Sequence, residues 1–181
     1  MTYRSTMTEI VFAFDSEAAA HMDTFTRSGA HQALSFVSGK DQKKHNFRLN
    51  LDCECLGDLI VSDYGHSVLC RVDSSDDLSL FEMIEETAAA SLPTTIDFRP
   101  FIKDEKFFMK LQFKNDKYRA SIDPTFAPSK PEQAPFHQGA RLKIDCSVSM
   151  WINYANSNAG LMLGVNKVIV DGGKKRTLKR R

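Results

Sequence analysis

The sequence predicts a mainly β protein, and three observations indicate it. Residues 106–114 alternate apolar and polar side chains over their whole length. Residues 141–154 repeat the same alternation. Strict alternation is the pattern of a strand that buries one of its two faces. Only residues 76–91 have the spacing of a convincing helix. We therefore expect a barrel-like antiparallel sheet with one main α-helix.

The inward faces of the two alternating segments predict the core. They carry apolar side chains at every second position, and we expect these to face one core: Phe107, Met109, Leu111, Phe113, Leu142, Ile144, Cys146 and Val148.

The helix at residues 76–91 has clear start and stop signals. Ser79 and Glu82 have the spacing of a capping box, with residues 74–77 as an alternative start. Its apolar stripe contains Phe81, Ile84 and Ala88, and Pro93 follows its end. We expect this helix to pack across the end or side of a sheet.

Turn residues divide the rest of the chain into short elements. Strands are expected over residues 9–14, 46–55, 59–61, 67–72, 117–122 and 161–170, with a short helix over 16–22. Residues 123–140 hold four of the six prolines. Such a segment cannot join the interior of a sheet, so we expect a long Pro-rich loop there.

Length and cysteine pattern limit the class of protein. The chain of 181 residues suits one domain, which we place at residues 1–173, followed by a flexible basic tail at 174–181. No apolar run could span a membrane, and no apolar signal core opens the chain. Cys53, Cys55, Cys70 and Cys146 fall on apolar phases, which predicts buried, reduced thiols and an intracellular, reducing location.

The charges are distributed unevenly along the chain. Residues 1–98 hold 7 Lys and Arg against 16 Asp and Glu, whereas residues 99–181 hold 17 against 7. This asymmetry suggests that the second half faces a polyanion. The tail contributes six positive charges, which suit a phosphate clamp or a nuclear-import signal equally: Lys174, Lys175, Arg176, Lys179, Arg180 and Arg181.

Catalytic motifs are missing from the sequence. There is no phosphate-binding glycine loop, no zinc-protease HExxH motif and no GxSxG. The five histidines have no metal-ligand spacing. We therefore expect neither an enzyme nor a bound metal or cofactor.

Trp151, the only tryptophan, falls on the polar face of residues 141–154, in phase with Arg141 and Lys143. A large aromatic among basic residues on an outer sheet face is typical of a surface on which nucleic-acid bases stack. Phe108, Trp151 and either Tyr118 or Phe126 are the candidate platforms. The candidate phosphate contacts are Lys106, Lys110, Lys114, Arg119, Arg141 and Lys143.

The same residues also suit purely structural roles. Phe108 and Trp151 could each pack beneath a helix or a second sheet. Basic residues on strands could serve as protection against edge-to-edge pairing. With short strands, one helix and a basic aromatic face, the sequence nevertheless favours an OB-type Greek-key barrel.

The second half of the chain resembles one family. It has the helix, the Phe-Arg-Pro-Phe-Ile-Lys segment at 98–103, the strand at 106–111, a Pro-rich loop ending at Gln138 and Gly139, the long strand with Trp151, a turn at Gly160 and a last strand at 165–170. In this order it is similar to the replicative single-stranded-DNA-binding proteins of short-tailed phages and their counterparts in large nucleocytoplasmic DNA viruses. The resemblance covers about residues 95–170.

The resemblance implies an OB fold, no enzyme activity and no required metal. Proteins of that family end in an acidic tail with a terminal aromatic, which recruits replication partners, whereas this chain ends in Lys and Arg. We expect a non-enzymatic single-stranded-DNA-binding protein, viral in origin, that protects single strands in replication, recombination or repair at the host nucleus or a viral replication site. The alternative is a virion or other structural β-protein with a nucleic-acid-binding tail. Single-stranded DNA or RNA, further copies of the chain and replication proteins are the candidate partners.

Overall fold

The structure is a computed structural model that describes residues 10–14, 29–38, 44–63 and 65–171. It is mainly β, as predicted, and helix α2 (Ser75–Ala90) is the one α-helix in this part of the chain. No helix there is long and apolar enough to cross a membrane. The expected short helix at 16–22 and the basic tail lie outside the described residues.

The chain forms two compact units. Unit 1 consists of Met1–Leu49, Asp76–Lys103 and Cys146–Gly164, and unit 2 consists of Asn50–Ser75, Asp104–Asp145 and Val165–Arg181. Three strands contribute residues to both units, namely β4 (Arg48–Cys55), β12 (Arg141–Asn153) and β13 (Asn158–Asp171). The single OB-like domain over residues 1–173 stays a prediction.

Unit 1 is built around strand β2 (Gly29–Ser38). This strand pairs antiparallel with β1 (Ile10–Phe14), with β3 (Lys44–Asn46) and with the last residues of β12. Strand β7 (Asp97–Arg99) instead runs parallel to the start of β13. The predicted antiparallel pairing is therefore confirmed for β2 and wrong for β7. Residues 97–99 form a strand where the sequence predicts none.

Helix α2 buries one face, as its sequence predicts. Asp76 and Asp77 lie in its first turn, where their negative charges interact favourably with the positive end of the helix dipole. The predicted apolar stripe is buried, and Phe81 stacks on Phe101 with ring centroids 5.7 Å apart. The backbone N–H of Phe101 donates a hydrogen bond to the Glu85 carboxylate. The helix therefore fixes the segment that follows β7 in the chain.

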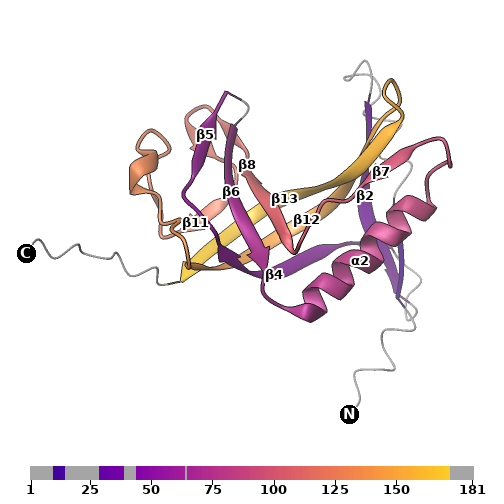
Figure 1. Ribbon diagram of the computed structural model, residues 1–181, viewed down its shortest axis with the longest axis horizontal. Helices are drawn as coiled ribbons and strands as arrows, with labels where there is room; N and C mark the ends of the chain where they lie inside the picture. The colour runs from indigo at the N-terminus through magenta and orange to yellow at the C-terminus, as the bar shows by residue number, and fades with distance from the viewer. Residues whose placement is uncertain (1–9, 15–28, 39–43, 64, 172–181) are drawn as a thin grey trace, which may run out of the picture. The chain divides into compact units, whose positions relative to one another are not determined.

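Unit 2 is centred on strand β6 (Gly65–Val72), which pairs antiparallel with residues 53–55 of β4, with β5 (Ile60–Ser62) and with β8 (Lys106–Leu111) (Figure 1). Strand β11 (Ser121–Asp123) runs parallel to the end of β13. Along β8 the predicted alternation is confirmed, with one face buried and the other exposed. Along β12 every second residue from Leu142 to Ile152 is buried, also as predicted.

One predicted core residue, Phe113, lies elsewhere. Strand β8 ends at Leu111, and β9 (Phe113–Lys114) and β10 (Lys117–Tyr118) form a separate antiparallel hairpin. Its turn residues Asn115 and Asp116 have φ of 54° and 59°, as expected for a tight turn between two strands. Phe113 is 38% exposed, whereas the other seven predicted core residues are buried. The strand is interrupted at residue 112, so the alternation of buried and exposed side chains along β8 does not continue to Phe113.

The Pro-rich loop joins no sheet, as predicted, apart from Asp123 in β11, and it contains a 3-10 turn, η2 (Pro131–Gln133). Its end is anchored by backbone hydrogen bonds, from Gly139 to the Cys55 carbonyl and from Cys55 to the Ala140 carbonyl, each 2.8 Å long. Gly139 has a φ of +87°, which favours glycine. The loop also buries Phe136. All four cysteines are free and buried, as predicted.

Candidate functional site

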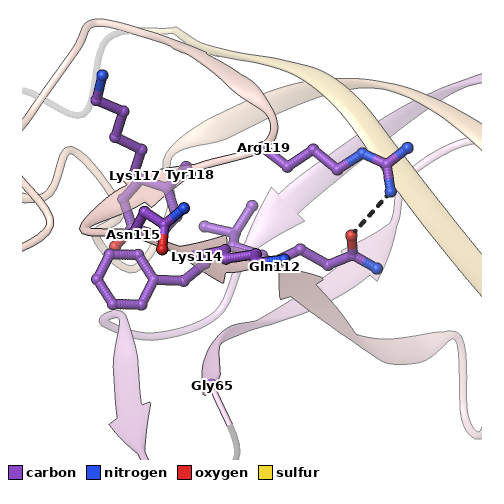
Figure 2. Close-up of a pocket in the computed structure, with 9 residues that line it drawn as sticks. Gly65, Gln112, Lys114, Asn115, Lys117, Tyr118 and Arg119 are labelled. Carbon is purple, nitrogen blue, oxygen red and sulfur yellow. Dashed lines mark hydrogen bonds between the residues drawn. The ribbon is translucent and has the colours of Figure 1, made fainter.

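The β9–β10 hairpin of unit 2 borders a cavity of about 650 Å³, called here the hairpin pocket (Figure 2). Gly65, Leu111 and residues 112–115 and 117–119 line it. The pocket exists because the hairpin leaves the sheet after Leu111 and turns back within six residues. This places consecutive polar and aromatic side chains around one cavity.

A row of aromatic rings in contact with one another includes two of the rings of the hairpin. The imidazole of His66, which is buried, stacks on Phe113 at a centroid distance of 4.8 Å. Phe113 also lies next to Tyr118, which lies next to Phe126, and Phe126 contacts Phe136 edge-on at 6.0 Å. The row runs from Phe113, which is exposed, to Phe136, which is 1% exposed. An exposed ring held in this way is fixed before any ligand arrives.

His66 and Tyr118 are joined by a hydrogen bond. The Nδ1 atom of His66 lies 2.6 Å from the Tyr118 hydroxyl oxygen. Burial raises the pKa of Tyr118 above its ordinary value, so its phenol is uncharged at neutral pH. The bond therefore links a buried residue of β6 to the hairpin and fixes the orientation of the tyrosine ring.

The charged side chains that line the hairpin pocket are all positive. Lys114, Lys117 and Arg119 line it, and none of its described lining residues is acidic. The Arg119 guanidinium donates a hydrogen bond of 3.2 Å to the Gln112 side chain, and Figure 2 shows Lys117 extending away from that pair. An aromatic surface, three cations and two side-chain amides, Gln112 and Asn115, are together suited to the base and phosphate of a nucleotide.

The outer face of β8 is a second basic and aromatic surface in unit 2. Phe108 is 50% exposed, and Lys106 and Lys110, two residues before and after it, are exposed on the same face. On neighbouring strand β6, Leu69 lies opposite Phe108. The exposure predicted for these three residues is confirmed, and their contact with nucleic acid stays a prediction.

The other two predicted phosphate contacts, Arg141 and Lys143, lie outside the hairpin pocket. Arg141 forms an ion pair with Asp73, which raises the pKa of the guanidinium, so its charge is already matched. Lys143 lines a groove of about 410 Å³ with Lys167 and the carboxylates of Asp52 and Asp145. The structure thus brings Lys114, Tyr118 and Arg119 together, but it does not add Arg141 or Lys143 to them.

Trp151 belongs to unit 1 and has different surroundings. It is partly exposed, and its indole lies over Gly160 of β13, where an added Cβ would be 2.9 Å from Cζ2. Residues 146–164 include no charged side chain. The alternation that put Trp151 on the outer face is confirmed, but the segment around it supplies no cation.

Several residues of the hairpin pocket are not apparent from the sequence. By pattern alone His66 is one of five scattered histidines, Phe113 belongs to the core, and Gln112, Asn115 and Lys117 do not stand out. The sequence signal that could have indicated this site is local: three basic residues, Lys114, Lys117 and Arg119, lie on either side of a two-residue turn. The partnership of His66 with the hairpin has no sequence signal.

Among the described residues, no three His, Cys, Asp or Glu side chains gather as they would around a metal ion. The six basic residues of the tail lie outside the described part of the chain. No protein-family model and no curated protein matches this sequence.

Proposed function

We propose that this chain is a non-enzymatic single-stranded-DNA-binding protein and that the hairpin pocket is its main contact with the strand. The observation that supports this most strongly is the exposed Phe113 ring, which stacks on buried His66 and lies in a pocket whose described lining contains three cations and no carboxylate. The outer face of β8 extends the contact with Phe108, Lys106 and Lys110.

Single strands fit this chemistry better than duplexes. An aromatic ring binds a base through its flat face, which a duplex covers by stacking and pairing. Base stacking on a protein ring contributes about 1–3 kcal/mol and needs no particular sequence. The cations bind the backbone phosphates, which are present on every nucleotide. The result is binding that depends on strandedness and salt rather than on sequence.

The proposal also covers the type of β-barrel, the related proteins and the biological role. We propose an OB-type Greek-key barrel and kinship with the viral proteins that the second half of the chain resembles. The mainly β architecture and the exposed Lys-Phe-Lys face of β8 support this. The corresponding role is protection of single strands in replication, recombination or repair, in a reducing intracellular compartment that contains viral DNA. Trp151 remains a candidate stacking platform because its indole is partly exposed.

Salt dependence tests the proposal. Fluorescence anisotropy should show tighter binding of the full chain to oligo-dT than to a duplex of equal length. Five phosphate contacts, by Lys106, Lys110, Lys114, Lys117 and Arg119, give a log–log salt slope of about −3.5, because each single-strand phosphate contributes about −0.7. Lys117→Ala should reduce that slope by about 0.7. Lys130→Ala, an exposed lysine outside the pocket, should leave it unchanged.

A tail variant separates the proposal from the structural-protein alternative. In this variant the six basic residues at 174–181 are replaced by Gln. Preference for oligo-dT over duplex should persist, because the hairpin pocket is intact. If all binding disappears with the tail charges while Lys117→Ala has no effect, the chain contacts nucleic acid through its tail alone. The structural-protein interpretation would then replace the proposal.

A further inference from the structure

A second cavity in unit 2 adjoins the hairpin pocket. It has a volume of about 300 Å³ and is called here the loop pocket. Its walls include Ile122, Phe126 and Pro128 from β11 and the Pro-rich loop, and Asp116 from the hairpin turn. Two residues, Lys117 and Tyr118, line both pockets. The two cavities are therefore neighbours that share one aromatic and one cationic side chain.

Each pocket has its own second ring. The centroid of Tyr118 is 5.7 Å from that of Phe113 in the hairpin pocket and 5.3 Å from that of Phe126 in the loop pocket. These spacings leave no room for a base between neighbouring rings, because carbon atoms in contact need about 3.5 Å on each side of an inserted ring. Bases must therefore pack against the open sides of the rings, one in each cavity.

The charges of the two pockets differ. The hairpin pocket has Lys114 and Arg119 in addition to the shared Lys117, whereas Asp116 adds a carboxylate to the loop pocket. A phosphate bound wholly in the loop pocket would face that carboxylate. The shared Lys117 is thus the cation best placed for a phosphate that joins a nucleotide in one pocket to a nucleotide in the other.

We propose that two consecutive nucleotides of one strand occupy the two pockets. One base packs against Phe113, the next packs against Phe126, and the Lys117 ammonium binds the phosphodiester between them. The unit recognised is then a dinucleotide step and not a single nucleotide. This inference rests on the proposed function, because it specifies how the same site holds a strand.

Short ligands test the dinucleotide step with the full-length, isotopically labelled chain. The probes are thymidine monophosphate, the dinucleotide TpT and TpT with an uncharged methylphosphonate linkage, and the readout is the backbone amide shifts on titration. Thymidine monophosphate should shift amides near Phe113, whereas TpT should shift those near Phe113 and Phe126 alike. TpT should bind about 5- to 150-fold more tightly than the monophosphate, since a further stacked base contributes about 1–3 kcal/mol.

Variants and the neutral probe test the role of Lys117. Lys117→Ala should remove most of the preference for TpT over its methylphosphonate analogue, and Lys130→Ala should keep it. The same spectra report whether each variant is folded. Equal affinity for TpT and thymidine monophosphate, or equal affinity for charged and neutral TpT, would overturn the inference. If oligo-dT still binds in that case, only the dinucleotide step is wrong; if oligo-dT does not bind either, the proposed function is wrong as well.

Discussion

The Nδ1 atom of His66 lies 2.6 Å from the hydroxyl oxygen of Tyr118, although 52 positions separate the two residues in the sequence. The same imidazole stacks on Phe113. One buried histidine therefore holds both aromatic residues of the short hairpin. The exposed ring surface proposed to bind bases depends on a residue that is itself only 6% exposed.

Tyr118→Phe should destabilise the protein by about 1–3 kcal/mol, because it leaves the buried His66 nitrogen without its partner. Urea unfolding followed by circular dichroism measures this. Tyr154→Phe is the matched control, since Tyr154 is 57% exposed and its substitution should change the free energy of unfolding by less than about 0.5 kcal/mol. Equal values for the two variants would show that the His66–Tyr118 bond does not stabilise the fold.

Phe113 and Phe107 should respond differently to truncation, although both lie on the same phase of the sequence. Phe107→Ala removes a buried ring and should destabilise by about 3–5 kcal/mol. Phe113→Ala removes a partly exposed ring and should cost no more than about 2 kcal/mol. The same urea experiment compares them. If Phe113→Ala destabilised the protein more than Phe107→Ala, Phe113 would have to be a core residue.

Gly160→Ala should displace the indole of Trp151, because the new methyl group would lie 2.9 Å from Cζ2. Trp151 is the only tryptophan, so the intrinsic fluorescence reports on it directly. We expect an emission shift to longer wavelength and a destabilisation of about 1–3 kcal/mol from overpacking. Gly57→Ala should change neither, since no described atom beyond its chain neighbours lies within 4 Å of its added Cβ. An unshifted spectrum for Gly160→Ala would contradict the contact.

Alkaline pH should weaken the fold through Cys70. Burial, with a smaller contribution from the neighbouring Cys55, raises the pKa of the Cys70 thiol from 9.0 to about 12. Below about pH 9 the thiol is protonated in both the folded and the unfolded chain, so its contribution to stability is complete. Above that pH the unfolded chain loses the proton first, and the free energy of unfolding should fall as the pH approaches 12.

The slope of stability against pH isolates this effect. Cys70→Ala should make the fall between about pH 9 and pH 12 shallower, apart from any constant loss from the smaller side chain. Tyr118, whose pKa burial also raises, adds its own decrease above about pH 10 in both proteins. Unfolding by urea at a series of pH values gives the two curves, and parallel curves would contradict the assignment to Cys70.

Much of the fold could be predicted from local patterns. The alternation of residues 141–154 depends only on which side chains are apolar, and burial along β12 follows it. Apolar spacing and the alternative start at residues 74–77 placed helix α2 within one residue of its observed ends, whereas the capping box predicted at Ser79 is wrong because Ser79 lies inside the helix. The parallel pairing of β7 with β13 could not be predicted in this way, because pairing between distant segments leaves no periodic signal in either one.

The candidate site was harder to predict for a physical reason. Phe113 continues the phase of Phe107, Met109 and Leu111, and only the tight turn at residues 115–116 reveals that the chain leaves the sheet. His66 lies on the buried phase of β6, where its partner is set by tertiary packing. The sequence shows how many cations the chain has. It does not show which of them already form ion pairs, as Arg141 does with Asp73.

The central claim is tested most directly by the affinity of Phe113→Ala for oligo-dT, measured by anisotropy beside the wild-type chain. Loss of the exposed ring should weaken binding by about 1–3 kcal/mol, because one stacked base is lost. Tyr154→Ala, which removes an exposed ring outside the hairpin pocket, should bind as the wild type does. A folded Phe113→Ala variant with wild-type affinity for oligo-dT would contradict the assignment of the hairpin pocket as the strand-binding site.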